Sequence, residues 1–166
     1  MIELSPEEIE KLPYRDCAGI MMLNDSKQVF VARRIDTTSE AWQMPQGGID
    51  GGEDVKETAL RELKEEIGTD NVEVLAESKD WYFYDLPKEI VGKIWKGRYR
   101  GQRQKWFVVR FLGADAEINI ETEHPEFNEW KWIDAQDMPD IIVPFKKKLY
   151  EDLIEEFKDI ISGGKK

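Results

Sequence analysis

The stretch GGIDGGEDVKETALRELKEEIG (residues 47–68) places a glycine-rich turn directly before a segment with helical periodicity. At 3.6 residues per turn, the apolar side chains of residues 54–67 share one stripe, which must face a core. The stripe consists of Val55, Ala59, Leu60, Leu63 and Ile67. We therefore expect an amphipathic helix over residues 54–67, entered through a turn in which the backbone is exposed.

Acidic side chains run along the flank of this stripe. Glu62 and Glu66 are one turn apart, and Glu65 lies just beyond them. Arg61 has Glu57 and Glu65 above and below it on the outer face, whereas Glu62 and Glu66 have no such basic neighbour at helical spacing. Two like charges at this spacing destabilise a helix by roughly 0.2–0.5 kcal/mol. The pattern therefore indicates that a cation binds at this edge of the helix.

Hard divalent ions are the cations that such a cluster suits. Mg²⁺ prefers oxygen ligands and is usually held by one or two carboxylates plus substrate phosphates. The glycines at 47, 48, 51 and 52 let the backbone approach a ligand closely, so the Gly47 carbonyl is also a usable ligand. We expect a Mg²⁺ site that Mn²⁺ can also occupy. The alternative is that the acidic residues form an ordinary solvated helix face.

The full spacing resembles the Nudix box, a signature of one glycine, several acids and an arginine at fixed intervals. The matching positions are Gly47, Glu53, Arg61, Glu62, Leu63, Glu65, Glu66 and Gly68. Thr69 departs from the pattern, because a bulky aliphatic residue is expected there, and this affects packing more than chemistry. The resemblance predicts a single Nudix hydrolase domain over residues 1–166, with its box at residues 47–68.

Further motifs resemble one Nudix subfamily, the bacterial RNA pyrophosphohydrolases and the related diadenosine polyphosphate hydrolases of bacteria and plants. They are WQMPQGGIDGGED (42–54), YDLPK (84–88), GQRQKWF (101–107) and PEFNEWKW (125–132). The resemblance implies a magnesium-dependent hydrolase of diphosphate linkages, in a nucleotide polyphosphate or at the 5′ end of a triphosphorylated RNA. Two alternatives stay open: a dedicated diadenosine tetraphosphate hydrolase with little activity on RNA, and a noncatalytic module that senses nucleotides. Noncatalytic Nudix domains typically lose box acids, which this chain retains.

The resemblance also assigns roles to the acidic residues. It implies metal ligation by Gly47, Glu62, Glu65, Glu66 and Glu126. Glu62 is the best candidate for the general base or a bridging ligand, and Glu126, in the PEF motif, stays open as the alternative base. Arg61 is expected to serve catalysis by positioning the glutamates through hydrogen bonds.

Substrate contacts are assigned in the same way. Arg34, Lys105 and Tyr84 match positions near phosphate in relatives, and Arg15, Val143 and Phe145 match base-binding positions. Stacking in an apolar sandwich suits any base. For Val143 and Phe145 the alternative is core packing of the last helix.

The remaining sequence predicts an α/β/α sandwich with a mixed central sheet. Apolar runs at 17–23 and 28–33 flank a turn and indicate a hairpin. Strands are also expected within 72–84, at 104–112 and at 130–133, and a second amphipathic helix over 145–161.

Length and composition limit the number of domains and the cellular compartments that we expect. The chain has 166 residues, which suits one domain, and it contains no apolar run long enough to span a membrane. The N-terminus lacks the features of a signal peptide. Cys17 is the single cysteine, expected as a small core residue on a strand, so no internal disulfide forms and a cytoplasmic location fits.

The net charge of −11, from 35 acidic and 24 basic residues, argues against an extended nucleic-acid-binding surface. It does not argue against a polyphosphate substrate, because bound metals and local basic patches supply positive potential. Such patches occur at 33–34, 93–103 and 146–148, either as substrate grips or as ordinary solvated surface. We favour a monomer and leave the oligomeric state open.

Overall fold

A computed structural model describes residues 5–35, 42–49, 51–91, 97–122, 125, 127–142 and 146–161. Its strands are β1 (Tyr14–Leu23), β2 (Val29–Arg34), β3 (Trp42–Gln43), β4 (Gln46–Gly48), β5 (Val72–Glu77), β6 (Tyr82–Asp85), β7 (Gly101–Phe111) and β8 (Phe127–Ile133). Its α-helices are α1 (Pro6–Glu10), α2 (Val55–Ile67), α3 (Lys88–Val91), α4 (Lys147–Glu156) and α5 (Lys158–Ile161), with 3₁₀ turns η2 (Asp115–Glu117) and η3 (Ala135–Asp140).

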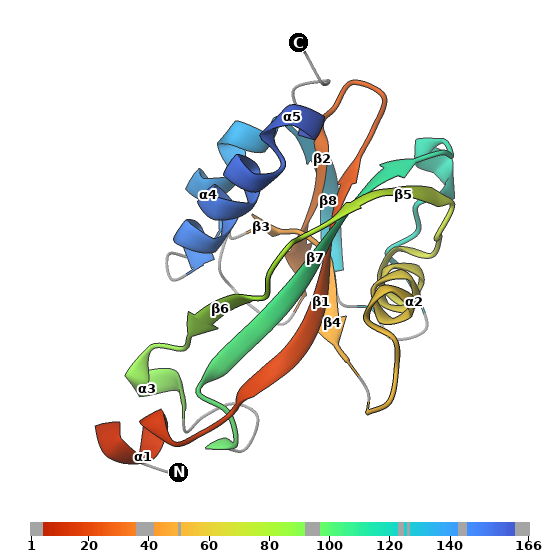
Figure 1. Cartoon of the computed structure of the whole chain (residues 1–166). Coiled ribbons are helices and arrows are strands. Elements are labelled where there is room, and N and C mark those ends of the chain that lie inside the picture. The colour runs from red at the N-terminus through yellow and green to blue at the C-terminus, as the bar shows by residue number, and fades with distance from the viewer. Residues whose placement is uncertain are drawn as a thin grey trace.

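The strands form one eight-stranded mixed sheet with the order β3-β2-β1-β7-β5. β4 pairs with β1, β6 with β7, and β8 with β2. The central pair, β1 and β7, is parallel from Tyr14↔Gly101 to Leu23↔Arg110, whereas the other pairs are antiparallel. Helix α2 covers one face of the sheet, and α4 with α5 covers the other (Figure 1). The predicted α/β/α sandwich with a mixed central sheet is confirmed.

Two apolar cores lie on opposite faces of the central strands. Along β1, Ile20 and Met22 pack toward α2, while Met21 and Leu23 pack toward α4, as the alternation of a strand requires. A strand buried on both faces reads as a continuous apolar run, and 17–23 does so. Within the residues described, no helix has both the length and the apolar composition to cross a bilayer.

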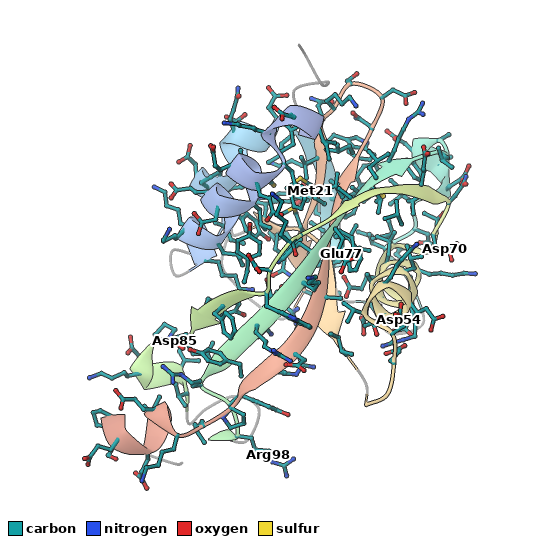
Figure 2. The ribbon with its side chains drawn as sticks, viewed as in Figure 1. Met21, Asp54, Asp70, Glu77, Asp85 and Arg98 are labelled. Carbon is teal, nitrogen blue, oxygen red and sulfur yellow. The ribbon has the colours of Figure 1, made fainter. Side chains whose placement is uncertain are left out.

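The predicted helix after the glycine turn is confirmed as α2. Asp54 caps its N-terminus by accepting a hydrogen bond from the Glu57 amide at 3.1 Å, and Gly68 ends it in the left-handed conformation at φ 81°. Figure 2 labels Asp54 at one end of this helix and Asp70 beyond the other. The predicted hairpin is confirmed too: the Asn24 side chain accepts from the amides of Ser26 and Gln28, both at 2.9 Å, and β2 follows.

Two segments differ from expectation. The strand region within 72–84 splits into β5 and β6, because Ser78 leaves the ladder: its hydroxyl accepts from the Trp106 amide and donates to the Asp80 carbonyl. The last helix breaks at Phe157, whose backbone leaves the helical conformation while its side chain stays buried, so α5 follows as a separate turn. Phe145, the expected start of that helix, lies outside the described residues.

Candidate active site

The centre of the site is the contact between α2 and strand β4. β4 pairs with β1 through Ala18↔Gly47, and α2 lies against this edge. A Cβ atom on Gly47 would fall inside the carboxyl group of Glu62. Glycine is therefore required at 47, because only a residue without a side chain lets the helix place a carboxylate against the strand backbone. The two residues that sequence reasoning paired as metal ligands are adjacent.

Arg61 organises the acids around this contact. Its Nε and Nη2 donate to the two oxygens of Glu53 at 2.8 and 3.0 Å, and Nη1 donates to Glu65 at 3.1 Å. Nη1 also lies 3.3 Å from Glu62 Oε2, so the expectation that Glu62 has no basic neighbour is wrong. The hydrogen bond to Glu53 is the main cause that raises the pKa of the Arg61 guanidinium. These contacts hold the arginine as a fixed cation that orients three carboxylates.

Glu66 lies deeper than its expected place on the flank of the helix. Only 3% of the residue is exposed, and it sits among the buried residues of α2 with Ala59 and Leu63. The Glu65 side chain, by contrast, is 58% exposed. A carboxylate in this position is costly to desolvate unless positive charge or hydrogen bonds compensate it. Its burial therefore places a second carboxylate at this edge of the helix, one turn from Glu62.

The carboxylates are the type of ligand that a hard divalent ion prefers. In this structure they do not form a closed coordination shell. In the described part of the chain, no group of three or more acidic, histidine or cysteine side chains stands close enough to hold a metal ion. Arg61 binds Glu65, and Glu126, the expected acid from outside the box, lies outside the described residues together with His124. The structure does contain a close contact between the Glu62 carboxylate and Gly47, called the acidic cradle below. It offers carboxylate oxygens beside the strand backbone.

A cleft of about 490 Å³ opens beside Glu62. It is lined by Tyr14, Arg15, Asp16, Gly48, Ile49, Arg61, Glu62 and Tyr99. The Arg15 guanidinium lies where a side chain on residue 48 would be, its Cζ 2.9 Å from that Cβ position. A second glycine thus brings a cation to the edge strand that carries the acidic cradle. The cleft combines carboxylates with a positive group, as a phosphate-bearing substrate with its metal ions requires.

Arg15 and Tyr84, both predicted to bind substrate, gather around Cys17 on the α4 face of the sheet. Arg15 Nη1 donates to Cys17 Sγ at 3.5 Å, and burial raises the pKa of this thiol to about 11. Cys17 is buried on β1, as predicted. Tyr84 is 9% exposed, and burial raises the pKa of its phenol above the usual range. These three groups come from strands β1 and β6, which β7 separates.

Lys146 joins this group. Sequence reasoning placed it in the basic patch 146–148, either as a substrate grip or as solvated surface, and its burial argues against the solvated alternative. Its Nζ lies 5.4 Å from the ring centre of Tyr84. Burial, with Arg34 as the next cause, lowers the pKa of its ammonium to about 8. The sequence signal that could have predicted the burial of Lys146 is its position directly after the apolar residue Phe145. Val143 and Phe145, the predicted base-binding pair, lie outside the described residues.

Lys105 is separated from Arg15 and Tyr84 by the register of the sheet. It pairs with Ala18, so it faces the α2 side. There its Nζ donates to the Lys79 carbonyl at 3.3 Å and lies 3.7 Å from Glu77. The structure therefore places two predicted substrate residues on opposite faces of the sheet, Lys105 on the α2 face and Tyr84 on the α4 face.

Comparisons with known proteins agree with this geometry. The family model described as the NUDIX domain matches residues 13–153. The chain is 54% identical over 154 residues to an RNA pyrophosphohydrolase of Sphingopyxis alaskensis, covering 92% of this chain and 98% of the relative. It is 54% identical over 157 residues to an RNA pyrophosphohydrolase of Roseobacter denitrificans, covering 93% and 98%.

Solved structures share the fold at low sequence identity. The E. coli dihydroneopterin triphosphate pyrophosphohydrolase superposes with a TM-score of 0.64 at 18% identity, covering 86% of this chain and 98% of that one. A binary complex of the C. elegans Ap4A hydrolase gives a TM-score of 0.64 at 19% identity, covering 89% and 98%. The family match over most of the chain, the relatives and the acidic cradle all agree, so this chain belongs to the Nudix family, whose hydrolases generally use divalent metals such as Mg²⁺.

Proposed function

We propose that this chain is a Mg²⁺-dependent pyrophosphohydrolase that converts the 5′-triphosphate of RNA to a 5′-monophosphate, with Mn²⁺ able to replace Mg²⁺. The observation that carries the proposal is the Glu62 carboxylate held against Gly47 at the mouth of a cleft that also contains Arg15. Two relatives at 54% identity, matched almost end to end, bear the name RNA pyrophosphohydrolase. The retained box acids support catalysis over nucleotide sensing alone.

The reaction follows from the placement of charge. Water attacks a phosphorus atom and loses a proton to a carboxylate. The phosphoanhydride P–O bond breaks, and the bridging oxygen leaves with the other phosphate product. Glu62 is our first candidate for that base and Glu126 the second. When bound, the divalent ions neutralise phosphate oxygens and lower the pKa of water. Glu62, Glu65, Glu66, Glu126 and the Gly47 carbonyl are the groups that would hold them.

The other residues bind and orient. Arg61 keeps Glu53, Glu62 and Glu65 in a fixed arrangement, so it acts as a positioning residue that touches no substrate atom. Arg15, in the cleft, offers its guanidinium to a phosphate or a base. We assign Arg34, Tyr84 and Lys105 to the phosphate chain. Val143 and Phe145 are assigned to a base.

A dedicated diadenosine tetraphosphate hydrolase is the second candidate. The fold shared with the C. elegans Ap4A hydrolase is compatible with this candidate. At 19% identity, however, the similarity extends to the fold alone. The much higher identity to proteins named for RNA favours the first candidate.

The deciding experiment compares kcat/KM for a short 5′-triphosphorylated RNA and for diadenosine tetraphosphate, each with Mg²⁺, in the wild type and in Glu62→Gln. We expect the RNA to be preferred and Glu62→Gln to lose both activities. A preference for diadenosine tetraphosphate would select the second candidate. Absence of hydrolysis of either substrate by the wild type would leave only a binding module.

We further propose that residues 1–166 act as one Nudix domain, as a monomer in the cytoplasm. The family match from 13 to 153 leaves only short flanks, and the buried Cys17 thiol suits a reducing compartment. Sedimentation of the full chain at several concentrations tests the monomer.

A further inference from the structure

The sheet has an open part next to the cleft. β6 and the first halves of β1 and β7 extend past α2 toward α1 and α3 (Figure 1). In the registers Phe83↔Arg103 and Asp16↔Arg103, all three side chains point to one face, the face that α2 covers further along. Glu77 and Asp85 mark the two ends of this open part in Figure 2.

Aromatic rings and cations alternate on this surface. The Arg103 guanidinium lies 4.2 Å from the ring centre of Trp81, and the Lys105 ammonium lies 6.0 Å from it. Phe83 meets Tyr14 edge to face, with ring centres 5.0 Å apart. Phe83 is nonetheless 56% exposed, the largest such fraction among the large hydrophobic residues of the described chain. The exposed ring of Phe83 and the ring of Trp81 beside two cations give this surface aromatic groups on which a base can stack.

The surface is continuous with the catalytic cleft. Tyr14, which packs on Phe83, also lines the cleft beside Glu62. Asp16 lines the cleft too and accepts two hydrogen bonds from Arg103, at 2.6 and 3.2 Å. A chain whose 5′ end lies in the cleft therefore meets these rings as it leaves.

Charge decides how such a chain would be held. Arg103 is paired with Asp16 and Lys105 is near Glu77, so the local charges nearly cancel. In a protein with a net charge of −11, this surface offers phosphates little positive potential beyond that of Lys105, which is assigned to the phosphate chain. Stacking of bases on the rings does not depend on such potential and accepts any base. The surface thus suits a few unpaired bases and no extended duplex.

We propose that Trp81 and Phe83 form a stacking platform for the unpaired bases that follow the 5′ end of an RNA substrate. The proposal rests on the proposed function, because the occupant is the RNA whose triphosphate the cleft holds. The platform makes substrate length a determinant of activity. A small nucleotide, which ends within the cleft, gains nothing from it.

The test is steady-state kinetics on 5′-triphosphorylated RNAs of increasing length, from a dinucleotide upward, with the wild type, Phe83→Leu and Trp81→Leu. Leucine keeps an apolar side chain but removes the ring. We expect KM for the longer RNAs to rise ~tenfold in each variant, while kcat and the kinetics on the dinucleotide stay near wild type. The difference persists at raised salt, since stacking is not screened. Leu112→Ala, which truncates a residue 52% exposed just after β7, is the matched control.

The outcomes separate the platform from the proposed function. If the wild type cleaves RNA and its KM does not depend on length, or if Phe83→Leu and Trp81→Leu match the wild type at every length, the platform is wrong while the proposed function stands. If the wild type cleaves no RNA, both fail. Equal losses on the dinucleotide and on long RNAs, with a lowered Tm, would assign the rings to stability and also overturn the platform.

Discussion

At the scale of single residues, the buried Glu66 is the residue on which the proposed cation site depends most directly. Its carboxylate is buried beside the α2 core, and Glu62 is one turn away. Burying a carboxylate near a second one costs stability unless cations or hydrogen bonds compensate the charge. Such a residue is expected where function, rather than packing, selects the side chain.

Glu66→Gln should separate the contribution of Glu66 to activity from its contribution to stability. The amide has the same shape but no charge, so we expect kcat with Mg²⁺ to fall by two orders of magnitude or more, on the order expected for loss of a ligand or charged catalytic group. The Tm without metal should be unchanged or higher. Glu57→Gln, an exposed residue on the first turn of the same helix, is the control for the substitution itself. Near-normal kcat in Glu66→Gln would remove Glu66 from the site.

Lys146 allows a pH test at the same scale. Burial lowers its pKa from 10.5 to about 8, so the folded state disfavours the ammonium. The resulting loss of stability is present in full below pH 8, shrinks as the pH rises toward 10.5 and is absent above it. Lys146→Met removes it, so we expect a gain in unfolding free energy on the order of 3 kcal/mol at neutral pH that diminishes toward pH 10. A gain that does not vary with pH would contradict this account.

At the scale of elements, the contact between β4 and α2 builds the site. The helix approaches the strand so closely that residue 47 has no space for a side chain. Gly47→Ala should therefore displace the Glu62 carboxylate, either by rotating its side chain or by shifting the helix. The helix itself is fixed by its caps, which the substitution leaves intact.

We expect Gly47→Ala to lower kcat by about tenfold or more, because displacement of a catalytic group by about 1 Å costs about two orders of magnitude. Stability should fall by only about 1–3 kcal/mol, as for a small-to-large change at a contact. The control is Gly51→Ala in the same turn, where no atom lies within 4 Å of the added Cβ. Kinetics and thermal unfolding of the two variants give the comparison. Equal effects of Gly47→Ala and Gly51→Ala on kcat would mean that both glycines serve only turn flexibility. The close approach of Glu62 to Gly47 would then have no role.

The elements also show how far sequence reasoning reaches. Helix α2 was predictable because its periodicity, cap and terminal glycine are all local signals. The break between β5 and β6 was not, because it depends on Ser78 bonding to Trp106, a residue far along the chain. Tertiary contacts of this kind leave no periodic trace.

The site was predictable to the same extent. The cradle of Gly47 and Glu62 follows from a local motif, whereas the faces of Lys105 and Lys146 depend on register and burial. The parallel pairing of β1 with β7 puts Lys105 opposite Ala18, and sequence alone does not specify that register. The roles of Glu126, Val143 and Phe145 stay predictions.

At the scale of the whole molecule, the acidic composition bears on the proposed metal binding. The chain has 35 acidic residues against 24 basic ones, and several acids converge near α2. Arg61 offsets part of this negative charge, and a cation that binds only the folded state relieves the remaining repulsion. Stability should therefore depend on the divalent ion far more than on monovalent salt.

We expect Mg²⁺ at about ten times its Kd to stabilise the fold by roughly 1.4 kcal/mol, since only the folded state holds the site. For a chain of this length that corresponds to a rise in Tm of about 3–5 °C. The double variant Glu62→Gln, Glu66→Gln should gain much less Tm from Mg²⁺ than the wild type, whatever its Tm without metal. Sodium chloride at matched ionic strength controls for screening. If Mg²⁺ raises the Tm of both proteins equally, the ion binds elsewhere, and the acidic edge of α2 loses its assigned role.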